Sequence, residues 1–72
     1  MKTFYQYAMI YRGVQKKNDF KKMLADWMFK DHNFPKYSND YDELSRYLEW
    51  NSPFPEALKI FDELWDEYIL NK

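Results

Sequence analysis

Apolar side chains recur every three or four positions along most of the chain, a pattern that predicts amphipathic helices rather than strands. The first such set consists of Phe4, Tyr7, Ala8 and Tyr11. Thr3 can cap this segment by accepting hydrogen bonds from its first turn. Arg12 and then Gly13, the only glycine, suit a helix end, because glycine adopts the left-handed conformation without strain. We therefore predict a short helix that begins after Thr3 and ends at about Tyr11.

The strongest helical pattern follows a polar connector at residues 16–18. Asn18 or Asp19 can cap this second helix. Its apolar stripe consists of Phe20, Met23, Leu24, Trp27 and Met28. We predict that this whole stripe faces the core.

The segment 33–39 interrupts the helical periodicity. Pro35 favours an extended conformation for the residue before it, which is Phe34. We therefore predict an ordered loop that anchors Phe34 in the core, with Pro35 and Lys36 at the surface.

Two further helices are predicted in the second half of the chain. Asp40 begins the third, with Glu43 three positions later in a capping-box arrangement. Ser52 can cap the fourth, with Pro53 and Pro55 in its first turn. The residues expected to face the core are Tyr41, Leu44 and Leu48 in the third helix, and Ala57, Leu58, Phe61, Leu64, Trp65 and Tyr68 in the fourth, which runs to about Leu70. These patterns predict an all-α fold, a compact four- to five-helix bundle that forms one domain over residues 1–72.

Composition indicates how so short a chain is stabilised and where it resides. Phe, Tyr and Trp make up 22% of the residues, and cysteine is absent. Large aromatic side chains can support a small core that has no disulfide. The absence of cysteine fits a reducing compartment, and we find neither a signal-peptide pattern nor an apolar run long enough to span a membrane. We expect a cytoplasmic monomer that does not bind membranes.

The net charge of −1 conceals two oppositely charged halves. Residues 1–37 carry eight basic and three acidic side chains, a net charge of +5, whereas residues 38–72 carry three basic and nine acidic ones, a net charge of −6. Either the halves attract each other within the fold, or the basic surface meets an anionic partner. The basic cluster consists of Arg12, Lys16, Lys17, Lys21 and Lys22. Such side chains can contact phosphates but do not read bases, so weak, non-sequence-specific nucleic-acid binding is the alternative function.

Residue types that carry catalysis are present but not arranged for it. His32 is the only histidine, and no nucleophile or second ligand accompanies it in the pattern. Asp62 and Asp66 lie four positions apart, but two carboxylates without further ligands are more typical of a solvated helix face. We also find no phosphate-binding glycine loop and no nucleophile elbow. We therefore expect no enzymatic activity, no metal and no cofactor.

The three tryptophans differ in their positions on the predicted helices. Trp27 and Trp65 lie on inward stripes, whereas Trp50 lies off the stripe of the third helix. Trp50 either packs beneath the Pro53-Phe54-Pro55 turn or is a partly exposed aromatic contact. The leading functional hypothesis is a protein–protein interaction or regulatory module that uses exposed aromatic and charged side chains to bind an unidentified protein.

Four short motifs, in order, resemble the small bacterial YozE-like proteins. They are Thr3-Phe4-Tyr5-Gln6-Tyr7 with Arg12, Asp31-His32-Asn33-Phe34-Pro35-Lys36, Asp40-Tyr41 leading to Leu44-Ser45-Arg46-Tyr47-Leu48-Glu49, and Phe61-Asp62-Glu63-Leu64-Trp65 with Tyr68. The resemblance covers nearly the whole chain and implies a compact helical bundle similar to the sterile-alpha-motif-like fold. It implies no activity, since the family is functionally uncharacterised.

Overall fold

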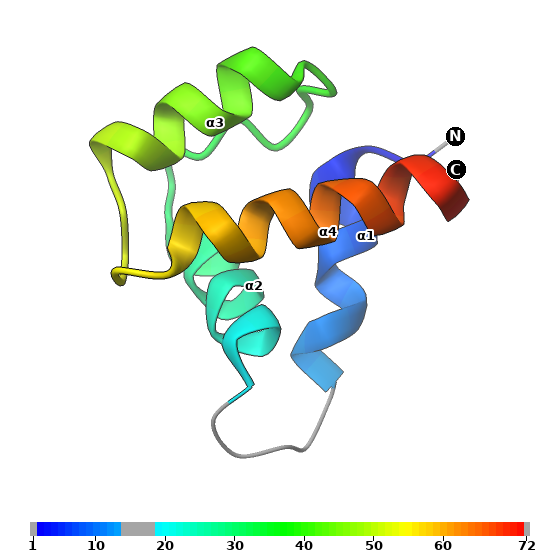
Figure 1. Cartoon of the computed structure of the whole chain (residues 1–72), viewed down its shortest axis with the longest axis horizontal. Coiled ribbons are helices and arrows are strands. Elements are labelled where there is room, and N and C mark those ends of the chain that lie inside the picture. The colour runs from blue at the N-terminus through cyan, green and yellow to red at the C-terminus, as the bar shows by residue number, and fades with distance from the viewer. Residues whose placement is uncertain (1, 14–18, 72) are drawn as a thin grey trace.

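The fold is organised around its last and longest helix. A computed structural model describes residues 2–13 and 19–71, which form four α-helices and one 3-10 helix without any strand, and this confirms the all-α prediction. The elements are α1 (Phe4–Ala8), the 3-10 helix η1 (Met9–Gly13), α2 (Phe20–Lys30), α3 (Tyr41–Trp50) and α4 (Ala57–Asn71). In Figure 1, α4 crosses the middle of the molecule, with α3 on one side, α2 on the other and α1 passing behind it.

The structure confirms Thr3 and Asp40 as the residues that cap two helix starts, but only Thr3 forms a capping box. Thr3 forms a complete capping box: its hydroxyl accepts from the Gln6 N–H at 3.1 Å, and the Gln6 carbonyl oxygen accepts from the Thr3 N–H at 3.0 Å. The capping box expected between Asp40 and Glu43 is wrong. The Asp40 N–H donates instead to the Ser38 hydroxyl at 3.1 Å, while the Asp40 carboxylate caps α3 alone.

Two helix boundaries differ from the predictions. The first helix tightens into the 3-10 geometry of η1 after Ala8, rather than continuing as α-helix. The fourth begins at Ala57, not near Ser52, because the Ser52 hydroxyl donates to the Phe54 carbonyl at 2.8 Å and thereby stabilises a turn. Pro53 and Pro55 therefore both precede the helix, and the prediction that they lie in its first turn is wrong. The Phe54 ring stacks on Phe20 of α2, which holds the turn against the bundle.

The centre of the core is aromatic. The Phe4 ring is fully buried and lies with its centroid 5.1 Å from that of Phe61 and 5.9 Å from that of Tyr68, in edge-to-face geometry. Phe34 is only 4% exposed, which confirms that it anchors the loop, and Pro35 is half-buried beside it. The buried cluster consists of Phe4, Ala8, Leu24, Met28, Phe34, Leu44, Leu48, Ile60, Phe61, Leu64 and Tyr68.

Several residues expected in the core lie at its edge. Phe20 and Met23 are 40% and 47% exposed, because α2 packs against both η1 and α4 through a face centred on Leu24 and Met28. Tyr41 and Leu58 are likewise exposed, while Trp27 and Trp65 are half-buried against the core. A 3–4 spacing identifies the inward side of a helix but not how wide a strip its neighbours cover.

Candidate functional site

The described part of the basic cluster is paired with carboxylates. Asp26 lies between two cations: its Oδ1 is 3.0 Å from the Arg12 Nε and its Oδ2 is 2.8 Å from the Lys22 Nζ. The hydrogen bond from Lys22, followed by that from Arg12, holds the pKa of Asp26 below its ordinary value. The Arg12 guanidinium also lies 3.7 Å from the centroid of the Phe29 ring, a cation–π contact.

Lys21 contributes to a second polar group, which we call the Glu67 cluster (Tyr7, Tyr11, Lys21 and Glu67). The Lys21 ammonium forms an ion pair with the Glu67 carboxylate, which also accepts hydrogen bonds from the Tyr11 hydroxyl at 2.6 Å and the Tyr7 hydroxyl at 3.3 Å. Burial raises the pKa of Glu67, but the hydrogen bonds from Lys21 and Tyr11 outweigh it, so that pKa lies below its ordinary value. The cluster therefore ties α1, η1 and α2 to α4.

Three of the five predicted basic residues are thus engaged within the fold. Lys16 and Lys17 lie outside the described residues. Of the three ion pairs found between described residues, Lys21–Glu67 joins the basic half to the acidic half, whereas both pairs to Asp26 lie within the basic half. A phosphate would compete with carboxylates for Arg12, Lys21 and Lys22, which weakens the case for a nucleic-acid surface.

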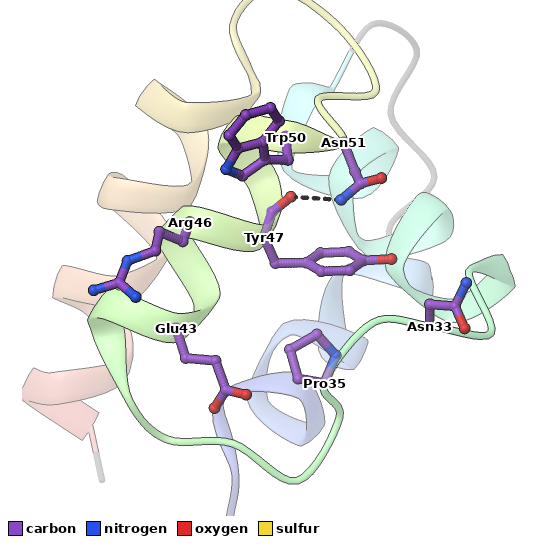
Figure 2. A pocket seen from close by; sticks show the side chains of 7 residues that line it. All are labelled: Asn33, Pro35, Glu43, Arg46, Tyr47, Trp50 and Asn51. Carbon is purple, nitrogen blue, oxygen red and sulfur yellow. Dashed lines mark hydrogen bonds between the residues drawn. The ribbon is translucent and has the colours of Figure 1, made fainter.

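Trp50 lies elsewhere, at the last residue of α3, and its side chain is 84% exposed. Trp50 therefore does not pack beneath the Pro53-Phe54-Pro55 turn, and its role as an aromatic contact stays a prediction. Beside Trp50 lies a groove of about 370 Å³, which we call the α3 groove. Its lining residues are Asn33, Pro35, Glu43, Arg46, Tyr47, Trp50 and Asn51 (Figure 2).

The α3 groove exists because α3 is the least enclosed helix of the bundle. Among the described helices, its backbone lies close only to α4. The other side of α3 faces the loop that follows α2, and Tyr47 connects the helix to this loop. The Tyr47 hydroxyl donates to the Asp31 carboxylate at 2.5 Å. The Tyr47 ring lies edge-on to the Phe34 ring, with 5.7 Å between the ring centroids. Burial and this hydrogen bond raise the pKa of Tyr47 to about 12. The base of the groove is consequently fixed by core contacts.

The polar groups of the α3 groove are exposed. Glu43 and Arg46 lie on successive turns of α3, and Figure 2 shows their side chains projecting from the helix toward solvent. Asn51 ends the helix, where its side-chain amide donates to the Tyr47 carbonyl at 3.0 Å. A second hollow of about 460 Å³ shares Pro35 and Glu43 with the groove. Its other lining residues are His32, Phe34, Lys36, Tyr37 and Ser38.

The sequence pattern pointed to Trp50 but not to the residues that surround it. Glu43, Arg46 and Trp50 are three to four positions apart, so their shared helix face was available as a signal. Pro35 comes from a different element, and only the folded chain brings it to the same groove.

Possible metal ligands and possible membrane-spanning helices were both sought among the described residues. Within residues 2–13 and 19–71, no three His, Cys, Asp or Glu side chains are grouped so that they could hold a metal ion. Asp62, one of the two candidate carboxylates, accepts a hydrogen bond from the Tyr41 hydroxyl at 2.6 Å. Across the same described residues, no helix is both long enough and apolar enough to cross a membrane.

The helices packed around α4 make the chain a small all-α bundle. The chain belongs to the YozE family with a SAM-like fold, whose family model matches residues 3–70. This confirms the resemblance drawn from the four motifs.

The relatives are bacterial proteins named UPF0346. One from Listeria monocytogenes is 42% identical over 99% of this chain and 91% of its own length. The UPF0346 protein YozE of Bacillus subtilis is 43% identical over 94% of this chain and 90% of its own length. A relative from Oceanobacillus iheyensis is 61% identical over 67% of this chain, and the match spans 63% of that protein. No solved structure matches the chain.

Proposed function

We propose that this chain is a non-catalytic, monomeric interaction or regulatory module of the cytoplasm, which binds another protein through the α3 groove. The observation that carries the proposal is the 84% exposure of Trp50 at the rim of a groove whose base is rigidly packed. Full burial of a tryptophan would remove roughly 150–250 Å² from water, worth about 4–6 kcal/mol before costs.

The composition of the groove supports the same proposal. Tryptophan, tyrosine and arginine are the residue types most enriched among those that dominate binding energy at protein interfaces. Trp50, Tyr47 and Arg46 lie together in the α3 groove. Tyr47 is held in place by Asp31, so little conformational freedom is lost there on binding.

Site-specific photo-crosslinking in the bacterium that carries the gene tests this function. A photo-reactive phenylalanine analogue is placed at Trp50 in one variant and, as a matched control, at Leu70, which is also 84% exposed but lies near the end of α4. We expect a discrete protein adduct at position 50 that survives nuclease treatment and is absent at position 70. Equal adducts at both positions, or none at position 50, would contradict the proposal.

A further inference from the structure

We propose that the α3 groove binds a proline-rich segment in the polyproline II conformation that carries an acidic residue beside its prolines. This inference rests on the proposed function and specifies the partner chemistry of the same groove. Three properties of the groove lead to it: its rings, its hydrogen-bonding groups and its charges.

The rings of the groove suit prolines. Trp50, Tyr47 and Pro35 line the same groove, and Figure 2 shows the Tyr47 ring between the other two. Proline-rich segments dock in aromatic-lined grooves because their conformation is already set before binding. The distance along α3 from Glu43 to Trp50 is roughly 10 Å at about 1.5 Å per residue, which matches about three residues of polyproline II at ~3.1 Å each.

Three side chains of the groove offer hydrogen-bond donors that the described part of the fold does not use. The Trp50 indole N–H and the Arg46 guanidinium can only donate, and the Asn33 amide offers two further N–H groups. Within residues 2–13 and 19–71, none of these three side chains donates to another residue. A polyproline II segment presents carbonyl oxygens and, at its prolines, no N–H that would require an acceptor.

Other peptide conformations fit less well. A strand would need the edge of a sheet to pair with, and the described residues form none. A helix would need a continuous apolar trough for its apolar face, whereas Glu43, Asn33 and Asn51 interrupt this one.

The charges of the groove favour a particular flanking sequence. Arg46 lies one turn before Trp50, and Glu43 lies one turn earlier still, toward Pro35. Arg46 forms no ion pair with any residue in the described part of the chain, in contrast to Lys21, Lys22 and Arg12. An acidic residue at the Trp50 end and a basic one at the Glu43 end would complement the groove and set the direction of the bound segment.

The test is titration of the isotope-labelled protein, followed by NMR, with a peptide of six prolines flanked by one aspartate and one lysine. A peptide of alanine and glycine with the same flanking charges is the control ligand. We expect saturable shifts of the Trp50 indole N–H and of residues 33–51 with the proline peptide only. Trp50→Ala and Arg46→Glu should each weaken binding by about tenfold or more, and Leu70→Ala should leave it unchanged.

Each other outcome overturns the inference. Unchanged shifts at millimolar proline peptide, or equal binding of the alanine–glycine peptide, would show that prolines are not recognised. Shifts that depend on protein concentration alone would assign the groove to a second copy of the chain. Because Trp50 is exposed, the NMR spectrum of the Trp50→Ala protein should keep the peak dispersion of a folded protein. A loss of binding in this variant would then not be caused by unfolding. A Trp50-dependent protein adduct without peptide binding would refute this inference and leave the proposed function standing.

Discussion

The Glu67 cluster and the α3 groove contain similar residue types, yet these side chains have different roles. In the Glu67 cluster, a lysine and two tyrosines point at one carboxylate and tie four elements together. In the α3 groove, an arginine, a glutamate and a tryptophan point at solvent. Arg12, Lys21 and Lys22, the described part of the basic cluster, therefore form ion pairs within the fold, whereas Trp50 remains exposed.

This difference shows that charge density is a poor guide to a binding surface when the two halves of a chain are oppositely charged. Partly buried ion pairs are screened less by salt than exposed ones, and they hold their members away from other partners. An exposed tryptophan buries little of its apolar surface when the chain folds, so that surface is available for association.

The largest expected effect is on the support beneath the groove. Phe34→Ala removes a buried ring that packs against Tyr47, Trp27 and Tyr5. We expect the free energy of unfolding to fall by about 3 kcal/mol or more, because a cavity is left in a small core. Urea denaturation measures this. Tyr37→Ala, at a neighbouring side chain that is 93% exposed, should change stability by less than ~0.5 kcal/mol. If Phe34→Ala and Tyr37→Ala lowered the free energy of unfolding equally, the loop would not be anchored through Phe34.

The next effect concerns the Glu67 cluster. Glu67→Gln removes a charge that accepts hydrogen bonds from Lys21 and Tyr11, and we expect a loss of about 1–3 kcal/mol at pH 7. Because the folded-state pKa of Glu67 is below its ordinary value of 4.5, its contribution is complete above that value. It should disappear as the pH falls through the folded-state pKa. The stability difference between the two proteins should therefore shrink toward pH 3, and a constant difference would contradict this assignment.

A smaller effect is expected at Tyr47, and with the opposite dependence on pH. Tyr47→Phe keeps the ring but removes the hydrogen bond to Asp31, at a cost of about 1 kcal/mol. The folded-state pKa is raised from 10.0 to about 12, so the contribution is complete below pH 10 and lost as the pH rises to about 12. Urea denaturation of the unaltered protein and of Tyr47→Phe between pH 8 and pH 12 measures this loss of stability. Tyr37→Phe is the control, since that side chain lies almost wholly in solvent.

The smallest effect is expected for the nucleic-acid alternative. With Lys21 and Lys22 both paired to carboxylates, we expect no detectable binding of random duplex at physiological salt, before or after Lys21→Glu and Lys22→Glu. Fluorescence anisotropy over a salt series checks this. Micromolar binding by the unaltered protein, with a log–log salt slope of about −0.9 per phosphate and loss in the double variant, would restore the alternative.

Much of the fold was predictable because its signals are local. The 3–4 spacing located all four helical segments, and Thr3 and Asp40 marked two of the starts. The prediction that Phe34 anchors its loop in the core was correct, and it came from the restriction that Pro35 places on the adjacent residue. The errors fall where local chemistry competes with packing. Ser52 could cap a helix, but the stack of Phe54 on Phe20 favours a turn there.

The sequence by itself determined the class of fold, the positions of the helices, the charge asymmetry and the family, since each depends on residue types at short, fixed spacings. Only the tertiary structure decided which charges are available and which aromatic residues are exposed. Lys21 pairs with Glu67, 46 positions away, and Pro35 of a loop comes to line the same groove as Trp50 at a helix end. Such distances depend on how helices pack, and packing is a property of the whole core.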